Sequence, residues 1–228
     1  MKNSSHAIQG RTYAGESLED RQAKRRLQFI EAAFELFGTI GFRQTTVRNL
    51  CKQAGLTDRY FYESFQSIEQ LLAEVYQREI RHIETEVLTS ISENINHASI
   101  KTLIEQTLEV FFAVAEKPKT AKIVWFEVLG VSETIDQLYI STIQNFANLF
   151  AQLSMNIYPD LKIPNAEVTT IAIGVIGAIS QTTSLWYLSH YQTDKQTLIR
   201  SMSYMIQGTH LLLSQPNMQN IEMDNSNE

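Results

Sequence analysis

The sequence predicts an all-α fold, with an N-terminal three-helix helix-turn-helix domain followed by a larger C-terminal helical domain. Apolar residues recur at helical spacing over most of the 228-residue chain. Proline and glycine residues break this pattern in the second half, at Pro118, Gly130, Pro159 and Pro164. No segment reads convincingly as a strand, and the 43% hydrophobic content supports a real core.

The first helix is predicted from Leu18 to Gly38, after a polar stretch (residues 1–17) that we expect to be a flexible tail. Basic residues cluster near the start of this helix, at Arg21, Lys24, Arg25 and Arg26. Its apolar residues predict an inward face made of Leu27, Ile30, Ala33, Phe34 and Phe37. This face is expected to pack against the two short helices that follow.

The first of these short helices is predicted to begin after Thr45 or Thr46, either of which can cap it. Val47 and Leu50 give the helix an inward face. Gly55 is expected to form the turn that follows, because a left-handed backbone costs glycine little. The pattern is therefore that of the first half of a helix-turn-helix.

The second short helix is predicted over Asp58–Ser64, with Thr57 or Asp58 as its cap. It is short enough to enter the major groove of DNA, and we interpret it as the recognition helix. The side chains that it would carry there are Arg59, Tyr60 and Tyr62.

A long fourth helix is predicted after Ser67, which can cap it, and continues past Ile83 towards Ile91. Further helices are expected at about 98–116, 119–131, 133–157, 166–191 and 195–214. The predicted organisation is thus a helix-turn-helix domain at 18–66, a helical domain at 67–214, and a second flexible tail at 215–228.

The charges of the chain are distributed unevenly. The net charge is −6, yet residues 1–65 hold ten Lys and Arg against seven Asp and Glu, whereas the remainder holds nine against eighteen. The positive part coincides with the predicted recognition helix, and the acidic part would be repelled from a duplex. This asymmetry favours DNA binding through the N-terminal domain.

Cysteine usage and hydropathy predict a cytoplasmic protein without a membrane partner. The single cysteine, Cys51, allows no internal disulfide, and no apolar run follows the polar N-terminus. The longest unbroken apolar run, Ile171–Ile179, is well short of the ~20 residues that cross a bilayer. A buried helix of a soluble protein fits this run better.

No catalytic, metal or cofactor site is predicted. The sequence has no glycine-rich phosphate loop and no nucleophile elbow. His82 and Glu86 lie four residues apart on a predicted helix, which is only a weak indication of a metal site. We therefore expect a protein that is not an enzyme.

Residues 21–75 resemble the tetracycline-repressor family of bacterial transcriptional regulators. The resemblance is carried, in order and at the family's spacing, by Leu36-Phe37, Gly41-Phe42, Thr45-Thr46, Ala54-Gly55-Leu56-Thr57, Phe61-Tyr62, Phe65 and Leu71-Leu72. Two positions differ from the family's pattern. Arg59 stands where many members have glycine, which adds a candidate base-reading residue, and Ile68 stands where a phosphate-binding lysine is common.

The resemblance implies a double-stranded DNA operator as the partner of the N-terminal domain. The expected DNA-binding residues are Thr45, Thr46, Thr57, Asp58, Arg59, Tyr60 and Tyr62. Arg59 can form a bidentate pair with guanine, or alternatively a surface salt bridge to Asp58 or Glu63. Tyr62 and Thr45 match family positions that hold phosphates, although Tyr62 could instead be a core aromatic residue.

The resemblance also implies a homodimer in which the last two long helices pair with their copies. The segment between Glu167 and Asp194 fits this role, because it holds no Asp, Glu, Lys or Arg between its ends. Small residues at Gly174, Gly177 and Ala178 would allow close contact between helices. A dimer of this kind binds a palindromic operator with two recognition helices.

A small-molecule effector is the third partner that the resemblance implies. The larger domain also concentrates aromatic residues, which could line a cavity for such a molecule. The expected ligand-binding residues are Phe111, Phe112, Trp125, Phe126, Glu127, Tyr139, Phe146 and Tyr187. The alternative is that these aromatic residues fill the core and that Glu127 pairs with Lys122. Together these features predict a ligand-responsive DNA-binding regulator, most simply a repressor. An all-α carrier or enzyme whose N-terminal domain does not bind DNA is the alternative.

Overall fold

The computed structural model describes residues 17–157 and 163–213, and these residues form helices and connecting loops without a strand. The predicted all-α fold is therefore confirmed. The chain divides into two compact units, Met1–Val75 and Tyr76–Glu228. The division falls inside helix α4, so the limits 18–66 and 67–214 stay a prediction. Of the predicted tails at 1–17 and 215–228, only Ser17 lies within the described residues.

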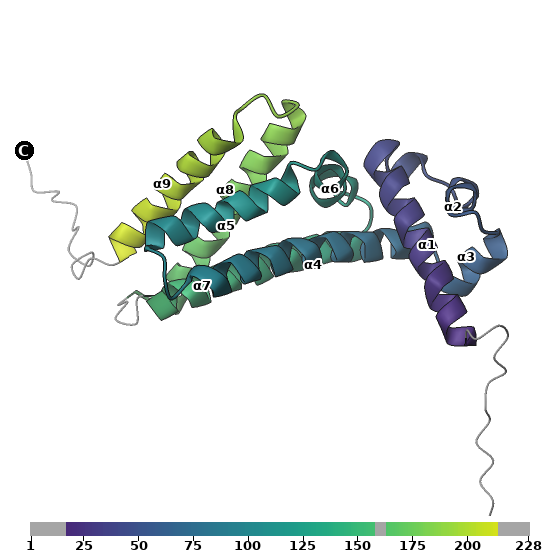
Figure 1. Cartoon of the computed structure of the whole chain (residues 1–228), viewed down its shortest axis with the longest axis horizontal. Helices are drawn as coiled ribbons and strands as arrows, with labels where there is room; N and C mark the ends of the chain where they lie inside the picture. The colour runs from purple at the N-terminus through teal and green to yellow at the C-terminus, as the bar shows by residue number, and fades with distance from the viewer. Residues whose placement is uncertain (1–16, 158–162, 214–228) are drawn as a thin grey trace, which may run out of the picture. The chain divides into compact units, whose positions relative to one another are not determined.

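The N-terminal unit contains three helices and the beginning of a fourth (Figure 1). Its elements are α1 (Leu18–Thr39), the 3₁₀ turn η1 (Phe42–Gln44), α2 (Val47–Ala54), α3 (Asp58–Ser64) and the first part of α4 (Ile68–Asn94). Ser17 begins α1 with a capping box, because its hydroxyl accepts the Asp20 backbone N–H while the Asp20 carboxylate accepts the Ser17 N–H. Helices α2 and α3 both pack against α1.

The buried face of α1 differs from the predicted one. Phe29, Ala33 and Phe37 are fully buried, whereas Leu27 is 54% exposed. Leu27 lies two residues from Phe29, which places it about 200° around a helix of 3.6 residues per turn. Ile30 is half-buried at the edge of the face. The inward prediction for Leu27 was therefore wrong, because helical spacing alone did not distinguish two overlapping apolar stripes.

The predicted turn chemistry is confirmed in its main features. Thr46, rather than Thr45, caps α2 by accepting the Asn49 backbone N–H at 3.2 Å. Gly55 follows α2 with φ 68° and ψ 28°, the left-handed conformation that the turn requires. Thr57 is the N-cap residue of α3, but its side chain forms no capping hydrogen bond.

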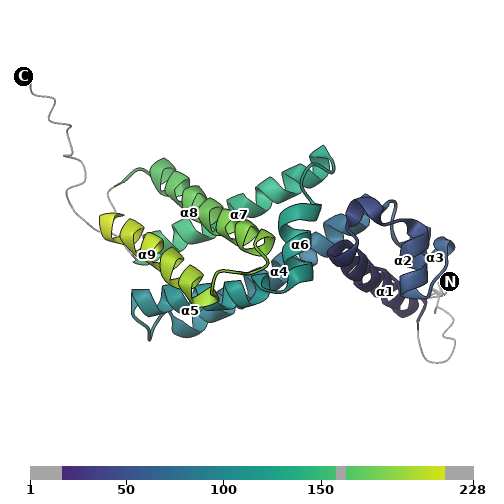
Figure 2. The same ribbon diagram turned by 90° about the horizontal axis from the view of Figure 1, so that it is seen from above.

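The C-terminal unit contains the rest of α4 and five further helices. They are α5 (Ile100–Ala115), α6 (Pro118–Lys122), α7 (Glu133–Ile157), α8 (Asn165–Leu188) and α9 (Lys195–Leu213). The segment predicted as one helix at 119–131 is instead α6 followed by a π-helical turn, η2 (Ile123–Glu127). Helix α7 packs against α8, and α5 packs against α9, which lies beside α8 (Figure 2).

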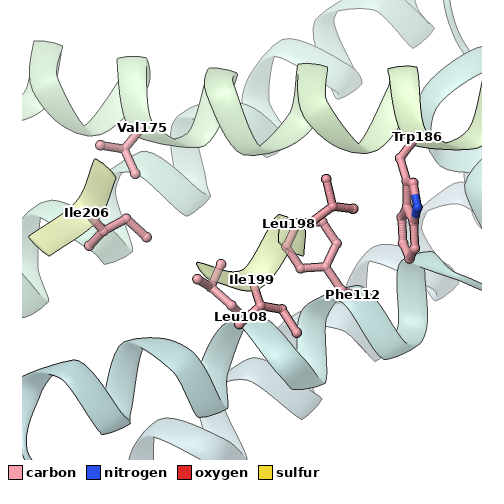
Figure 3. Packing of buried hydrophobic residues seen from close by; sticks show 7 residues of the cluster. All are labelled: Leu108, Phe112, Val175, Trp186, Leu198, Ile199 and Ile206. Carbon is pink, nitrogen blue, oxygen red and sulfur yellow. The ribbon is translucent and has the colours of Figure 1, made fainter. Parts of the chain in front are cut away.

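Three of these helices share an apolar core (Figure 3). Leu108 and Phe112 come from α5, Val175 and Trp186 from α8, and Leu198, Ile199 and Ile206 from α9. The Phe112 and Trp186 rings meet edge to face, with their centres 5.7 Å apart. Each such side chain contributes about 1.5–3 kcal/mol when it is fully buried. This core joins α5, α8 and α9 into one body.

Helices α8 and α9 also carry a second apolar face that no other part of residues 17–157 and 163–213 covers. Large apolar side chains on it are exposed, namely Ile173, Leu185, Leu188, Tyr204 and Leu211. By length and composition alone, α8 is also the one helix among the described residues that could cross a bilayer. A single helix of this kind is weak support for a membrane span, and α8 packs along α7 and α9.

Replacing Gly55 tests the turn. A β-carbon on Gly55 would meet no atom within 4 Å, so Gly55→Ala carries only the conformational cost of a left-handed backbone. We expect the free energy of unfolding of the N-terminal unit to fall by about 1–2 kcal/mol. Gly55→Asn is the matched control, since asparagine tolerates this conformation better, and urea unfolding followed by circular dichroism measures both. An equal loss in the two variants would contradict the assignment.

Candidate functional site

Helix α3 presents one face to the core and the opposite face to solvent. Phe61 and Phe65 are buried, and both rings contact Phe29 of α1. On the other side, the Arg59 side chain is 82% exposed and Tyr62 is 63% exposed. The burial of the two phenylalanines fixes which side of α3 is free. The outward side chains can therefore reach a groove of DNA.

The guanidinium of Arg59 is held along the outer face of α3. Its Nε donates to the Glu63 carboxylate at 2.9 Å, and this hydrogen bond raises the Arg59 pKa. The salt bridge weighed as an alternative to base reading is thus present with Glu63. Exposed ion pairs of this kind are weak and are screened by salt. The pair therefore leaves Arg59 able to exchange Glu63 for a base.

The three predicted threonines occupy different environments. Thr45 is buried, and its hydroxyl donates to the Gly41 carbonyl at 2.8 Å. A phosphate contact from Thr45 conflicts with this geometry, because the hydroxyl proton is already used inside the domain. Thr46 is exposed at the start of α2, and Thr57 and Asp58 are exposed at the start of α3. Backbone N–H groups at such helix ends attract phosphates.

The basic residues near the start of α1 have structural roles as well as a charge. The Arg25 guanidinium lies 4.3 Å from the centre of the Tyr60 ring, so Tyr60 is half-buried beneath it. Arg26 donates to the Ser64 carbonyl and pairs with Glu74 of α4. It therefore connects α1, the end of α3 and the start of α4. Arg26 therefore holds the helices of the N-terminal unit together, and its guanidinium is already engaged inside the unit.

The C-terminal unit contains an apolar cavity of about 190 Å³. Helices α4, α5, α7, α8 and α9 and the turn η2 all contribute to its wall, and most of the lining side chains are Ile, Leu, Val or Phe. Asp, Glu, Lys and Arg are absent from the lining residues that the structure describes. Cavities that are mostly apolar with a few polar groups are typical of small-molecule sites.

Four of the predicted ligand-binding residues line this cavity: Phe111, Trp125, Tyr139 and Phe146. The Phe111 and Trp125 rings meet edge to face, with centres 6.1 Å apart. The indole N–H of Trp125 donates to the Ser180 hydroxyl at 3.0 Å, which fixes the ring against α8. The aromatic residues of the larger domain therefore predicted part of the cavity wall.

The other four predicted residues, Phe112, Phe126, Glu127 and Tyr187, are not among the residues that line this cavity. Phe112 points into the core of α5, α8 and α9, because adjacent residues of a helix face different directions. Phe126 packs on the Tyr187 ring, with centres 5.1 Å apart. Glu127 pairs with Lys122 at 3.7 Å, which is the alternative named above. The π-helical turn redirects residues 126 and 127, and no sequence signal predicted that turn.

Sequence reasoning missed most of the aliphatic wall. Tyr76, Ile80, Ile83, Val87 and Ile91 line the cavity from α4. Their spacing of three and four residues was visible as a core-facing stripe, but it could not distinguish a packed core from a cavity wall. No sequence pattern indicated that the polar residues Thr107 and His210 would line the cavity.

Two ionisable cavity residues are uncharged at neutral pH. Burial raises the pKa of Tyr76 to about 12 and lowers the pKa of His210 below its usual range. The phenol and the imidazole are therefore both neutral near pH 7. The His210 ring also packs against the Phe150 ring, with centres 5.7 Å apart.

A buried hydrogen bond joins α6 to α4 beside the cavity. The Thr120 hydroxyl donates to the Glu79 carboxylate at 2.8 Å, and both residues are buried. Arg78 lies 3.3 Å from the same carboxylate. Helix α6 continues directly into η2, which carries Trp125.

Within residues 17–157 and 163–213, no group of three His, Cys, Asp or Glu side chains is arranged to hold a metal ion. The pair His82 and Glu86 is 3.8 Å apart, and the Lys117 amine lies 3.5 Å from the other ring nitrogen of His82. A lysine amine near the imidazole is unfavourable for a bound cation.

Residues 29–75 match the sequence model of the bacterial regulatory proteins of the tetR family. This range includes α2, α3 and the start of α4, whose geometry is that of a helix-turn-helix. Residues 29–75 are therefore similar to the DNA-binding domain that the tetR family shares, and this similarity supports a DNA-binding transcriptional regulator.

Solved structures of similar fold cover most of the chain. A transcriptional regulator of the TerR/AcrR family from Aquifex aeolicus is 22% identical, with a TM-score of 0.59 over 81% of this chain and 99% of its own. The fatty acid degradation regulator FadR from Bacillus halodurans is 17% identical, with a TM-score of 0.66 over 85% and 96%. FadR from Bacillus subtilis, solved with stearoyl-CoA, is 17% identical, with a TM-score of 0.64 over 79% and 96%. No curated protein sequence matches the chain.

Two substitutions on the outer face of α3 should affect DNA binding in different ways. Arg59→Ala should relax base preference at one position per half-site, with a loss of about tenfold in discrimination, because a bidentate base contact carries sequence information. Tyr62→Phe should weaken binding to all duplexes alike, since phosphate contacts carry none. Titration of each variant against operator DNA with single base changes measures the difference. A uniform loss for Arg59→Ala would rule it out as a base reader.

Proposed function

We propose that this regulator is a homodimeric repressor that leaves a palindromic operator when a small apolar or amphipathic effector occupies the cavity. The observation that carries the proposal is the course of α4. In the N-terminal unit, Leu71, Leu72 and Val75 of this helix are buried in the domain core. In the C-terminal unit, residues from Tyr76 to Ile91 of the same helix line the cavity. A shift of α4 would thus act on both.

The uncovered face of α8 and α9 supports the homodimer. It is apolar, and β-carbons built on Gly174, Gly177 and Gly208 would meet no atom within 4 Å. These glycines leave room for the backbone of a second copy to approach. Two α3 helices held about 34–36 Å apart would fit successive major grooves of an inverted repeat.

The cavity supports the effector. The FadR neighbour from Bacillus subtilis was solved with stearoyl-CoA, which has a long aliphatic part. An aliphatic ligand would suit the lining here. To release DNA, it must bind the DNA-incompetent conformation more tightly, because equal affinity for both conformations shifts nothing.

The route from cavity to DNA is proposed through Trp125, Thr120 and Glu79. A ligand against Trp125 would displace η2 and α6, and the Thr120–Glu79 hydrogen bond would transmit this displacement to α4. We place the protein in the cytoplasm, where the operator is, and we assign it no catalytic activity. The rival function is a carrier whose N-terminal unit does not bind DNA, and DNA titration separates the two.

Operator binding tests the DNA-binding half of the proposal. The protein should bind an inverted repeat as a dimer, and affinity should fall with salt because each neutralised phosphate contributes about 0.9 to the slope of log affinity against log salt. Fluorescence anisotropy at several salt concentrations measures this, with random duplex as the control. Equal affinity for the inverted repeat and random duplex would contradict the operator.

Effector coupling tests the sensory half. Hydrophobic compounds that raise the thermal midpoint should weaken operator affinity about 5- to 150-fold, and operator DNA should weaken their binding by the same factor. Thr120→Val should reduce this coupling while leaving the affinity for the compound unchanged. Thr85→Val is the matched control, because Thr85 is exposed on α4 and its hydroxyl donates to the Arg81 carbonyl. Stabilising compounds that leave operator affinity untouched would contradict the sensory half.

A further inference from the structure

We infer that the cavity selects an uncharged ligand, namely an aliphatic chain bearing one neutral hydrogen-bonding group that the Thr107 hydroxyl recognises. This inference deepens the proposed function by assigning the chemical class of the effector. It rests on the shape of the cavity, on the absence of charge in its wall, and on an unusual hydroxyl.

The lining residues extend a long way along two helices. On α4 they run from Tyr76 to Ile91, and on α7 they run from Tyr139 to Ile157. At 1.5 Å per residue, these stretches are about 22 and 27 Å long. The side chains between their ends are mainly aliphatic or phenyl. Such an elongated wall suits an extended hydrocarbon chain better than a compact polycyclic ligand.

The described part of the wall offers no counter-charge. The 26 lining residues within 17–157 and 163–213 contain no Asp, Glu, Lys or Arg, and burial lowers the pKa of His210, which favours its neutral form. A buried charge without a partner is strongly disfavoured in an apolar environment. Ligands that would place a carboxylate, a phosphate or an ammonium group inside are therefore excluded.

The charge balance of the chain after Phe65 agrees with a neutral ligand. This part of the sequence contains nine Lys and Arg against eighteen Asp and Glu. Two of the basic side chains are paired with carboxylates, Lys122 with Glu127 and Lys195 with Glu109 and Glu116. An excess of basic side chains, which would attract a polyanionic head group, is therefore not present in this part of the sequence.

One hydroxyl in the wall differs from its neighbours. Thr142 and Ser154 also line the cavity, and their hydroxyls donate to the carbonyls four residues earlier, at 3.0 and 2.9 Å. The Thr107 hydroxyl oxygen is buried and has no hydrogen-bond partner in the described part of the chain. A buried polar atom without a partner costs free energy, and a ligand group that pairs with it removes this cost. Alcohols, esters and ketones all provide such a group.

A series of ten-carbon ligands tests the inference on the full-length protein without DNA. The probes are 1-decanol, decane, decanoate, decylammonium and decanoyl-CoA at pH 8, and quenching of tryptophan fluorescence reports binding because Trp125 lines the cavity. We expect 1-decanol to bind about tenfold or more tightly than any of the three charged probes. Equal or tighter binding of decanoate, decylammonium or decanoyl-CoA would overturn the neutral class.

Two variants locate the recognised group. Thr107→Val should weaken 1-decanol binding about 2- to 12-fold, through loss of one hydrogen bond, and should leave decane binding equal or tighter. Thr183→Val is the matched control, since Thr183 is buried, does not belong to the lining, and its hydroxyl donates to the Ile179 carbonyl at 2.8 Å. An unchanged 1-decanol affinity in Thr107→Val, or an equal loss in Thr183→Val, would overturn the role of Thr107.

The inference and the proposed function fail separately. Selective binding of 1-decanol without loss of operator affinity would leave the ligand class intact and contradict the repressor that an effector releases. Release of operator DNA by a charged compound bound in the cavity would support the repressor and overturn the neutral class.

Discussion

The structure depends on one continuous helix that belongs to two cores. Helix α4 runs from Ile68 to Asn94, and its apolar residues recur at three and four positions along this whole length. The first turns complete the packing of the helix-turn-helix, where Arg26 also fixes Glu74. The later turns form one wall of the cavity. Under the proposed function, a displacement of the later turns would be carried to the first turns, because the backbone hydrogen bonds of a helix make it stiff.

The helix-turn-helix could be predicted from sequence because short-range rules determine it. A threonine cap, a glycine in the left-handed region and an α3 helix over Asp58–Ser64 all follow from chemistry within a few residues. The cavity could not be predicted in the same way. Its wall combines residues from five helices and a π-helical turn, and whether Phe111 or Phe112 faces the space depends on how those helices are packed together.

Two arginines of the N-terminal unit, Arg26 and Arg59, have different roles because their surroundings differ. Arg26 is half-buried, and its guanidinium donates to the Ser64 carbonyl and to the Glu74 carboxylate, so it stabilises the domain. Arg59 is exposed and holds only a neighbouring carboxylate one turn away. The sequence alone treats both as positive charge near DNA. The difference arises from burial. Breaking the half-buried contacts of Arg26 costs more free energy than breaking the exposed Arg59–Glu63 pair.

The cavity is better explained as a binding site than as imperfect packing. Protein interiors are usually close-packed, with few spaces larger than a water molecule. The 190 Å³ beside the core of Phe112, Trp186 and Ile199 is much larger than that. Its described lining is mainly aliphatic, which suits the apolar effector of the proposed function. Such a ligand would shift α4 only by binding one conformation of the regulator more tightly than the other, so its apolar contacts with Ile80, Ile83 and Val87 of α4 would have to differ between the two conformations.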